Sequence, residues 1–171
     1  MILRLIVENI ASFKNAVEFN TFPSSKSQSH NNHKVKCGHA TALRLGAIYG
    51  ANGAGKSNLI KSLFLLKQLI GLESLQKFPI GDSLAFKLDP TYSERPSGIA
   101  VEFYHGNNIY YYHIEFDRSQ VYTEELLLSK KSKDEPIFKR ENNTINIYHS
   151  FFANGANEQF ASPAAWWSTR R

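Results

Sequence analysis

Gly50-Ala51-Asn52-Gly53-Ala54-Gly55-Lys56-Ser57 is the stretch that decides the interpretation of this 171-residue sequence. It fits the pattern G-x-x-x-x-G-K-[ST], in which the glycines let the backbone turn with its N–H groups pointing inward. The lysine supplies a point charge for β- and γ-phosphates, and the serine hydroxyl can ligate Mg²⁺ that bridges the same oxygens. The stretch therefore predicts a phosphate-binding loop.

The sequence before this loop has the pattern of a strand, and the sequence after it has the pattern of a helix, as a P-loop requires. Residues 42–49 form a short apolar run that ends in the glycine-rich turn, which predicts a buried strand of the parallel type. After the loop, apolar residues recur at helical spacing from Lys56 to about Leu72, which predicts a helix with one apolar face. The apolar residues are Leu59, Ile60, Leu63, Leu66, Leu69 and Ile70.

The remaining pattern is that of antiparallel strands. Residues 2–8 and 16–19 predict an N-terminal hairpin, and residues 22–40 predict a polar, mobile loop that nucleotide binding does not need. Strands are expected at 99–105, 109–117 and 120–129, with a turn at 105–108. A further hairpin joins 137–138 to 145–148, so we expect a β-meander.

Composition limits the class of protein. With 42% hydrophobic and 13% aromatic residues, the chain can bury one core of mixed or β-rich type. Cys37 is the single cysteine, which excludes an internal disulfide, and a cytoplasmic, soluble protein without membrane contact is expected. A net charge of +5 suits a nucleotide or nucleic-acid partner, but the basic residues are dispersed apart from 130–133, a run that we interpret as a solvated turn.

Two further groups of residues have alternative interpretations. His30, His33, Cys37 and His39 could together ligate zinc, but their polar surroundings favour a solvated linker. The run 110–112 of three tyrosines, with Phe103 and Phe116, could stack on bases or pack into a core, and alternation along strands favours the core.

The stretch from Ile48 to Leu59, including Asn58 after the serine, resembles the P-loop of ABC-type ATPases in the RecF, structural-maintenance-of-chromosomes and overcoming-lysogenization-defect groups. Residues 5–14 and 17–19 resemble the first hairpin of these proteins, although Ala11 replaces their usual basic residue. Lys14 is then the nearby substitute for a ribose or phosphate contact. Over roughly 1–150 the sequence resembles bacterial AAA-domain proteins of this type from phage-defence and abortive-infection loci.

The resemblance implies features that this sequence does not contain in recognisable form. ABC-type hydrolysis needs an apolar strand ending in Asp-Glu and an LSGGQ-like signature, and neither motif is found. Asp117, with Glu115 before it, and Gln159 are weak substitutes for the Mg²⁺ carboxylate and the γ-phosphate sensor. We therefore expect the first part of a longer ATPase, inactive in hydrolysis by itself.

The sequence thus predicts an α/β P-loop NTPase of the ABC-ATPase type, with three parts. Residues 1–75 form the P-loop lobe, 76–150 an antiparallel β-lobe, and 151–171 a C-terminal segment. Nucleotide binding is expected from the residues Gly50, Ala51, Asn52, Gly53, Ala54, Gly55, Lys56, Ser57 and Asn58, with ATP and Mg²⁺ as cofactors.

Three functions remain open at this stage. The first is a switch in which a homodimer of ATPase heads gates a nuclease or toxin partner in antiphage defence, with DNA as the eventual substrate. The second is a RecF-like repair or chromosome-organising ATPase, and the third is a nucleotide-binding module without turnover.

Overall fold

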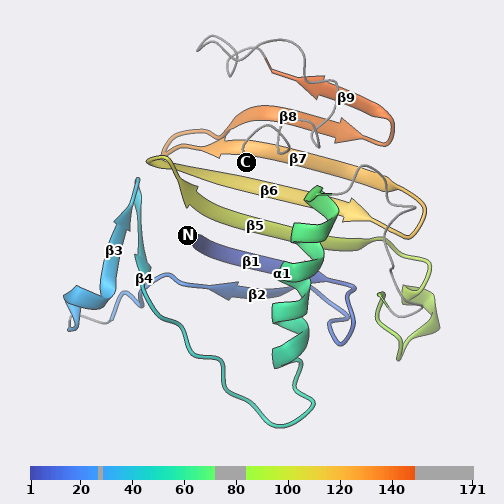
Figure 1. The fold of residues 1–171 in the computed structure, drawn as a ribbon, viewed down its shortest axis with the longest axis horizontal. Helices are drawn as coiled ribbons and strands as arrows, with labels where there is room; N and C mark the ends of the chain where they lie inside the picture. The colour runs from blue at the N-terminus through green and yellow to red at the C-terminus, as the bar shows by residue number, and fades with distance from the viewer. Residues whose placement is uncertain (27–28, 72–83, 149–171) are drawn as a thin grey trace.

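A seven-stranded antiparallel sheet with one α-helix across one face makes up most of the described chain (Figure 1). The computed structural model describes residues 1–26, 29–71 and 84–148. The strand order is β2-β1-β5-β6-β7-β8-β9, and β3 and β4 form a separate hairpin. Within these residues, no helix is long and apolar enough to cross a membrane.

The N-terminal hairpin joins the meander in a single sheet. β1 (Ile2–Glu8) pairs with β2 (Val17–Asn20) on one side and with β5 (Ser97–His105) on the other. Leu3, Leu5 and Val7 are buried because alternate side chains of β1 point to the same face. The sheet therefore runs across the boundary expected near residue 75.

The predicted antiparallel meander is confirmed. β5 is followed by β6 (Asn108–Phe116), β7 (Val121–Ser129), β8 (Glu135–Glu141) and β9 (Thr144–Ile147), each paired with its predecessor. The turn between β5 and β6 has positive φ at Gly106 (55°) and Asn107 (66°), as expected for a tight hairpin.

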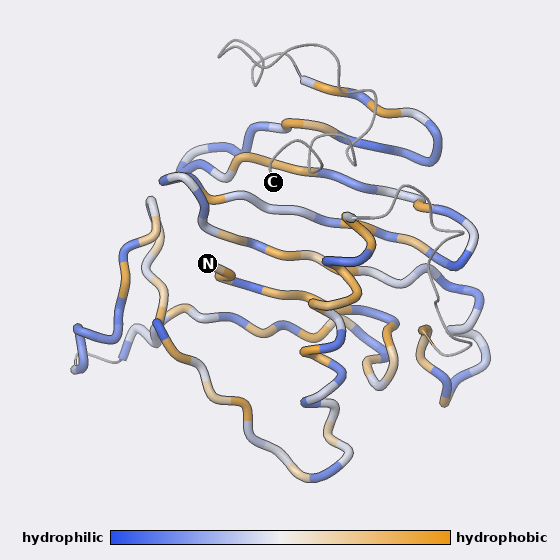
Figure 2. Tube along the Cα trace, viewed as in Figure 1, coloured by the Kyte–Doolittle hydropathy of each residue, from blue (hydrophilic) through white to orange (hydrophobic). Residues whose placement is uncertain are grey.

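Helix α1 (Lys56–Gly71) covers the apolar face of the sheet, as predicted. Leu59, Leu65, Leu66 and Leu69 pack with the buried side chains of the central strands. In Figure 2 the helix, with its apolar residues in orange, crosses the apolar stretches of these strands. Each leucine buried in this way contributes roughly 1.5–3 kcal/mol. Ile60, which we had placed on the apolar face, is instead 47% exposed.

Several aromatic residues of the meander pack in or against the main core. Tyr112 and Phe116 are buried in the main core, which confirms the core interpretation for these two. Phe103 and Tyr110 stack with their ring centroids 5.4 Å apart and pack against the same core.

Residues 22–40 are not the featureless loop that their composition predicts. They include a 3-10 turn at Asn31–His33 and strand β3 (Lys34–Cys37), which pairs with β4 (Ala40–Leu43). Cys37 and Ala42 are buried in a second small core with Leu3 and Ile109. The prediction was wrong because the short alternation of apolar and polar residues in β3 is masked by its polar neighbours.

The buried parallel strand predicted at 42–49 is also absent from the described residues. β4 ends at Leu43 and pairs only in antiparallel fashion, and residues 44–49 form no strand. Leu45, Ile48 and Tyr49 are 77%, 39% and 89% exposed. An apolar run is buried as a strand only where neighbouring strands accept its backbone hydrogen bonds, and no described strand does so here.

Asn9 fixes the turn that follows β1. Its amide Nδ2 donates to the carbonyl oxygens of Tyr92, Arg95 and Pro96 at 2.9–3.2 Å, and its Oδ1 accepts from the backbone N–H of Phe86 at 3.0 Å. The side chain is 2% exposed, and the backbone has φ of 50°, a conformation that asparagine tolerates. The segment 84–97 is thereby bonded to the 9–13 turn.

We expect Asn9→Ala to destabilise the fold by about 2–4 kcal/mol, because it leaves several buried backbone groups without a partner. Denaturant unfolding measures this loss. The control is Asn15→Ala, which removes an exposed asparagine from the same hairpin and should cost less than about 0.5 kcal/mol. Equal effects of the two substitutions would contradict the role given to Asn9.

Candidate functional site

The glycine-rich loop leads directly into the N-terminus of α1. Gly53 and Gly55 have φ of +83° and +90°, which side chains other than glycine rarely adopt. The N–H of Leu59 bonds to the Gly55 carbonyl at 3.0 Å, which begins the helical hydrogen-bond series. The first N–H groups of the helix have no intrahelical partner, so this end presents donors and the positive end of the helix dipole.

Lys56 folds back over the loop. Its Nζ donates to the carbonyl oxygens of Gly50 and Ala51 at 2.6 and 2.7 Å. The ammonium group therefore lies beside the backbone of the loop rather than extending into solvent. Ser57, the next residue, is exposed at the start of the helix. A cation, a hydroxyl and helical N–H donors together suit an anionic ligand that carries a metal ion.

The 9–13 turn packs directly against this loop. The Asn58 Nδ2 donates to the Ser12 Oγ at 3.0 Å, which joins the first turn of α1 to the N-terminal hairpin. A Cβ added at Gly55 would lie 2.8 Å from the Ser12 Oγ and 3.0 Å from the Phe13 ring. Glycine is needed at residue 55 for this close approach as well as for its φ. Sequence reasoning singled out Lys14 in this turn and missed Ser12, although a serine is part of the turn that it resembles.

Lys14, the substitute expected for a ribose or phosphate contact, is paired with Asp89 in the structure. Its Nζ bonds to the Asp89 Oδ2 at 2.9 Å and lies 4.9 Å from the centre of the Tyr92 ring. The hydrogen bond from Lys14, together with those from Thr91, lowers the pKa of Asp89 to about 2. This pair fastens the hairpin to segment 84–97.

Asp117 is occupied by its own turn. Its carboxylate accepts bonds from the Ser119 and Gln120 N–H groups, the Ser119 hydroxyl and the Tyr122 hydroxyl. Burial raises the pKa of Asp117, but these hydrogen bonds outweigh it and lower the pKa to about 2. The turn between β6 and β7 is well separated from the glycine-rich loop in Figure 1.

The other substitutes for the missing motifs do not meet the loop either. Glu115 accepts a hydrogen bond from the Thr123 hydroxyl at 3.0 Å and alternates with the buried Ile114 and Phe116, so it points away from the face that α1 covers. Gln159 and the segment 151–171 lie outside the described residues. The structure therefore brings together the loop residues, Asn58 and Ser12, but not the candidate carboxylates.

The proposed zinc ligands do not form a cluster. In the ranges that the structure describes, no group of three His, Cys, Asp or Glu side chains could hold a metal ion. His30 and His33 are in ring contact with their centroids 5.9 Å apart, whereas Cys37 is buried, with its Sγ 3.8 Å from the Met1 Sδ.

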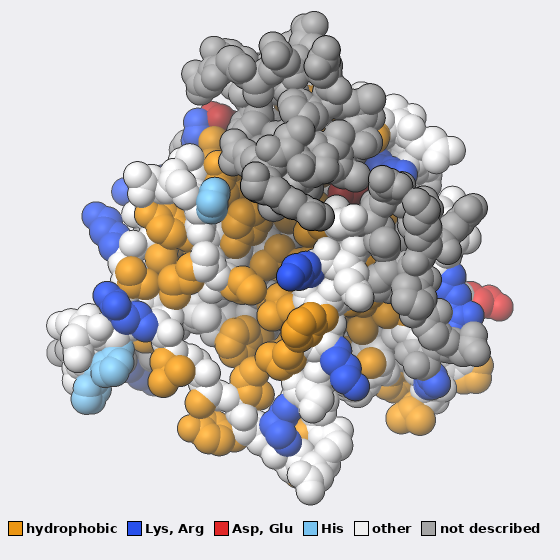
Figure 3. Space-filling view, in the orientation of Figure 1, with side chains coloured by type: hydrophobic (Ala, Val, Ile, Leu, Met, Phe, Trp, Pro, Cys, Tyr) orange, Lys and Arg blue, Asp and Glu red, His pale blue; other side chains and the backbone are white. Residues whose placement is uncertain are grey.

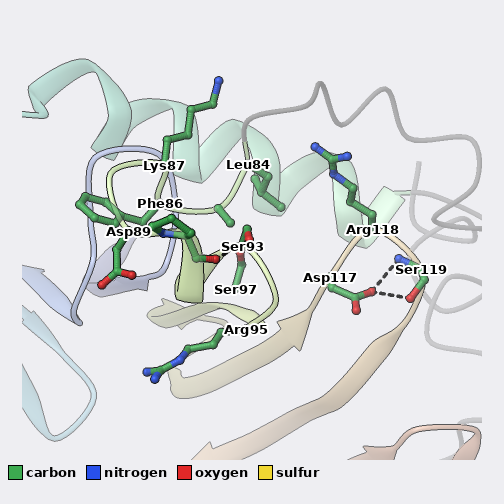
Figure 4. Close-up of a pocket in the computed structure, with 12 residues that line it drawn as sticks. Leu84, Phe86, Lys87, Asp89, Ser93, Arg95, Ser97, Asp117, Arg118 and Ser119 are labelled. Atoms are coloured by element: carbon green, nitrogen blue, oxygen red, sulfur yellow. Dashed lines mark hydrogen bonds between the residues drawn. The ribbon is translucent and has the colours of Figure 1, made fainter.

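A cleft of about 610 Å³ lies between segment 84–97 and the β6–β7 turn. Its charged side chains point in different directions, as Figure 4 shows. Lys87 extends away from the other labelled residues, and Asp117 turns back onto Ser119. The charged side chains of the cleft therefore do not converge on one point.

Comparison with known families settles the class of the chain. The family described as "AAA domain, putative AbiEii toxin, Type IV TA system" matches residues 46–165, more than half of the chain. The chain belongs to this family. No match was found among curated proteins.

Membership makes this AAA domain a P-loop ATPase of a family linked to abortive-infection and toxin–antitoxin systems. Such ATPases generally use ATP and Mg²⁺. In the described residues the fold is rich in sheet: the P-loop leads into α1, and α1 packs on an antiparallel sheet. The match begins at Gly46, so the N-terminal hairpin that holds the loop in place lies before the matched region.

Two glycine substitutions test the packing of the loop. Gly53→Ala should cost about 1–2 kcal/mol for its positive φ alone, because nothing lies within 4 Å of the added Cβ. We expect Gly55→Ala to cost at least about 1 kcal/mol more, since its Cβ overlaps Ser12 and Phe13. Thermal unfolding without nucleotide measures both, and equal losses would show that the 9–13 turn does not press on the loop.

Proposed function

We propose that residues 50–58 bind the phosphates of Mg·ATP, and that this AAA domain acts as the nucleotide-driven part of a switch. The observation that carries the proposal is the placement of the Lys56 ammonium over a loop with two left-handed glycines at the N-terminus of α1. Backbone N–H groups of the loop and helix would cradle the phosphates. The Ser57 hydroxyl would ligate Mg²⁺.

The bonds that Lys56 now makes support an exchange with phosphate. Its ammonium donates to two neutral carbonyl oxygens. In these bonds only the donor is charged, whereas a phosphate oxygen adds the attraction of an opposite charge, so phosphate would compete well for the same protons. Binding would release the carbonyls of Gly50 and Ala51, and the loop would change its internal bonding when nucleotide arrives.

The contacts around the loop offer a route from that change to the rest of the domain. Asn58 is bonded to Ser12, and the 9–13 turn is bonded through Asn9 to segment 84–97. We propose that ATP aligns the loop against this turn and so stabilises one arrangement of α1 on the sheet. Such a two-state element is what a switch requires.

The partner of the switch is proposed from the family description. A toxin–antitoxin context favours an effector, either a nuclease or a toxin, over a metabolic substrate. We propose an ABC-type arrangement, in which two ATPase heads associate when both hold ATP. The described residues contribute binding rather than hydrolysis to this cycle, since phosphoryl transfer to water also needs an oriented nucleophile and a fully coordinated metal.

Lys56→Ala and Ser57→Ala test the proposed site. Charge-assisted hydrogen bonds are each worth about 1.5–3 kcal/mol, so Lys56→Ala should weaken Mg·ATP binding by roughly 10- to 150-fold. Ser57→Ala should mainly remove the gain in affinity that Mg²⁺ provides. Calorimetric titration measures both.

The matched control is Lys61→Ala, which removes an equal charge from an exposed position of the same helix. Its affinity for Mg·ATP should change by less than about twofold. Unchanged binding by Lys56→Ala would refute the site. Light scattering with Mg·ATP and with Mg·ADP then tests the switch, which predicts a doubled mass only with ATP and only when Lys56 is intact.

A further inference from the structure

Acidic residues are absent from a long part of the sequence. Between Glu18 and Glu73 there are 54 residues without Asp or Glu, and they carry seven Lys or Arg side chains. The other 117 residues carry 13 basic and 15 acidic side chains. The net charge of +5 therefore comes entirely from residues 19–72. The basic residues are dispersed along the sequence, and the asymmetry lies in where the acidic residues are missing.

The β3–β4 hairpin presents part of this charge on one side. In its register Lys34 lies opposite Leu43 and Lys36 opposite Thr41, whereas Val35 lies opposite Ala42 and Cys37 opposite Ala40. The second set packs with Leu3 and Ile109, so the lysines occupy the outward face. This face, with the flanking His33 and Arg44, is called the basic ribbon below.

The basic ribbon stands at one end of the molecule. Figure 1 shows the hairpin beside the turn that joins β5 and β6, outside the seven-stranded sheet. Lys36, His33 and Arg44 are exposed, and the Arg44 N–H bonds to the His33 carbonyl at 2.9 Å, which holds the two ends of the ribbon together. On the face shown in Figure 3, basic and histidine side chains lie over the hairpin and α1, and few acidic side chains are visible.

We propose that the basic ribbon is a contact surface for double-stranded DNA. A two-stranded ribbon with cations on one face and no acidic neighbours in sequence suits the phosphate backbone, which dominates the affinity of DNA-binding proteins. Each strand has four residues and is about 13 Å long. The major groove of B-DNA, about 12 Å wide, admits a two-stranded ribbon, whereas the major groove of duplex RNA is too narrow.

The composition of the ribbon favours a duplex over a single strand. Proteins that hold single strands stack successive bases on aromatic side chains. Residues 29–44 contain no Phe, Tyr or Trp. The surface is therefore suited to neutralise phosphates, and binding should depend on salt and little on sequence. It involves different residues from the proposed ATP site.

Fluorescence anisotropy with a labelled 20-base-pair DNA duplex, at 50–200 mM salt, tests the proposal. The variant is Lys34→Gln, Lys36→Gln and Arg44→Gln combined. The matched control is Lys130→Gln, Lys131→Gln and Lys133→Gln combined, which removes the same charge from an exposed turn where Lys130 pairs with Glu135. Circular dichroism and calorimetric binding of Mg·ATP confirm that each variant is folded.

The ribbon variant should bind DNA at least about tenfold more weakly, and the slope of log K against log salt should fall by about 2.7, since each phosphate contact contributes about 0.9. The control and Lys56→Ala should bind within about threefold of the unmodified protein. Equal losses in the ribbon and control variants would overturn the proposal, as would failure of the unmodified protein to bind at 50 mM salt. Tighter binding of a single strand or an RNA duplex of the same sequence would also overturn it.

Discussion

The close approach of the 9–13 turn to Gly55 is the constraint on which the arrangement of the site depends. A loop with two left-handed glycines has many accessible conformations, and it becomes a defined site only when something outside the loop fixes it. Here the Ser12 hydroxyl and the Phe13 ring press against residue 55, and Asn58 bonds to Ser12. The turn itself is held by the buried side chain of Asn9. The position of the loop is thereby set by the sheet.

This constraint also links regions that are distant in sequence. Asn9 bonds to carbonyls of residues 92–96, and Lys14 bonds to Asp89, so the segment before β5 is fastened to the turn after β1. The pairing of β1 with β5 continues the same connection into the meander. The N-terminal hairpin thus connects the glycine-rich loop to the meander. A conformational change in the loop can therefore reach the meander through the 9–13 turn, and the reverse also holds.

The sequence was sufficient for the local elements and for the loop. Alternation identified β1, β2 and the meander, the turn residues Gly106 and Asn107 placed the β5–β6 hairpin, and helical spacing located α1. These features depend on neighbours within a few residues, so a local sequence pattern is enough to predict them. The loop was identified for a similar reason, since each residue type in it has its own chemical requirement.

Features that depend on distant partners were missed or misassigned. The apolar run 42–49 predicted a buried strand, but burial needs strands on either side, and a local pattern does not specify them. β3 was hidden among polar residues, and its burial depends on Leu3 and Ile109. The role of Asn9 depends on segment 84–97, and that of Ser12 on Gly55, so neither could be deduced from the spacing of residues near them.

Hydrogen–deuterium exchange with and without Mg·ATP tests most directly whether the loop and the 9–13 turn act as one nucleotide-responsive unit. If the account is correct, ATP slows exchange of the amides in residues 50–59 and also in residues 9–13, and Lys56→Ala abolishes both effects. Ser12→Ala should retain protection of the loop but lose it in the turn. Protection confined to other segments, with exchange in residues 50–59 unchanged by saturating ATP, would contradict the account.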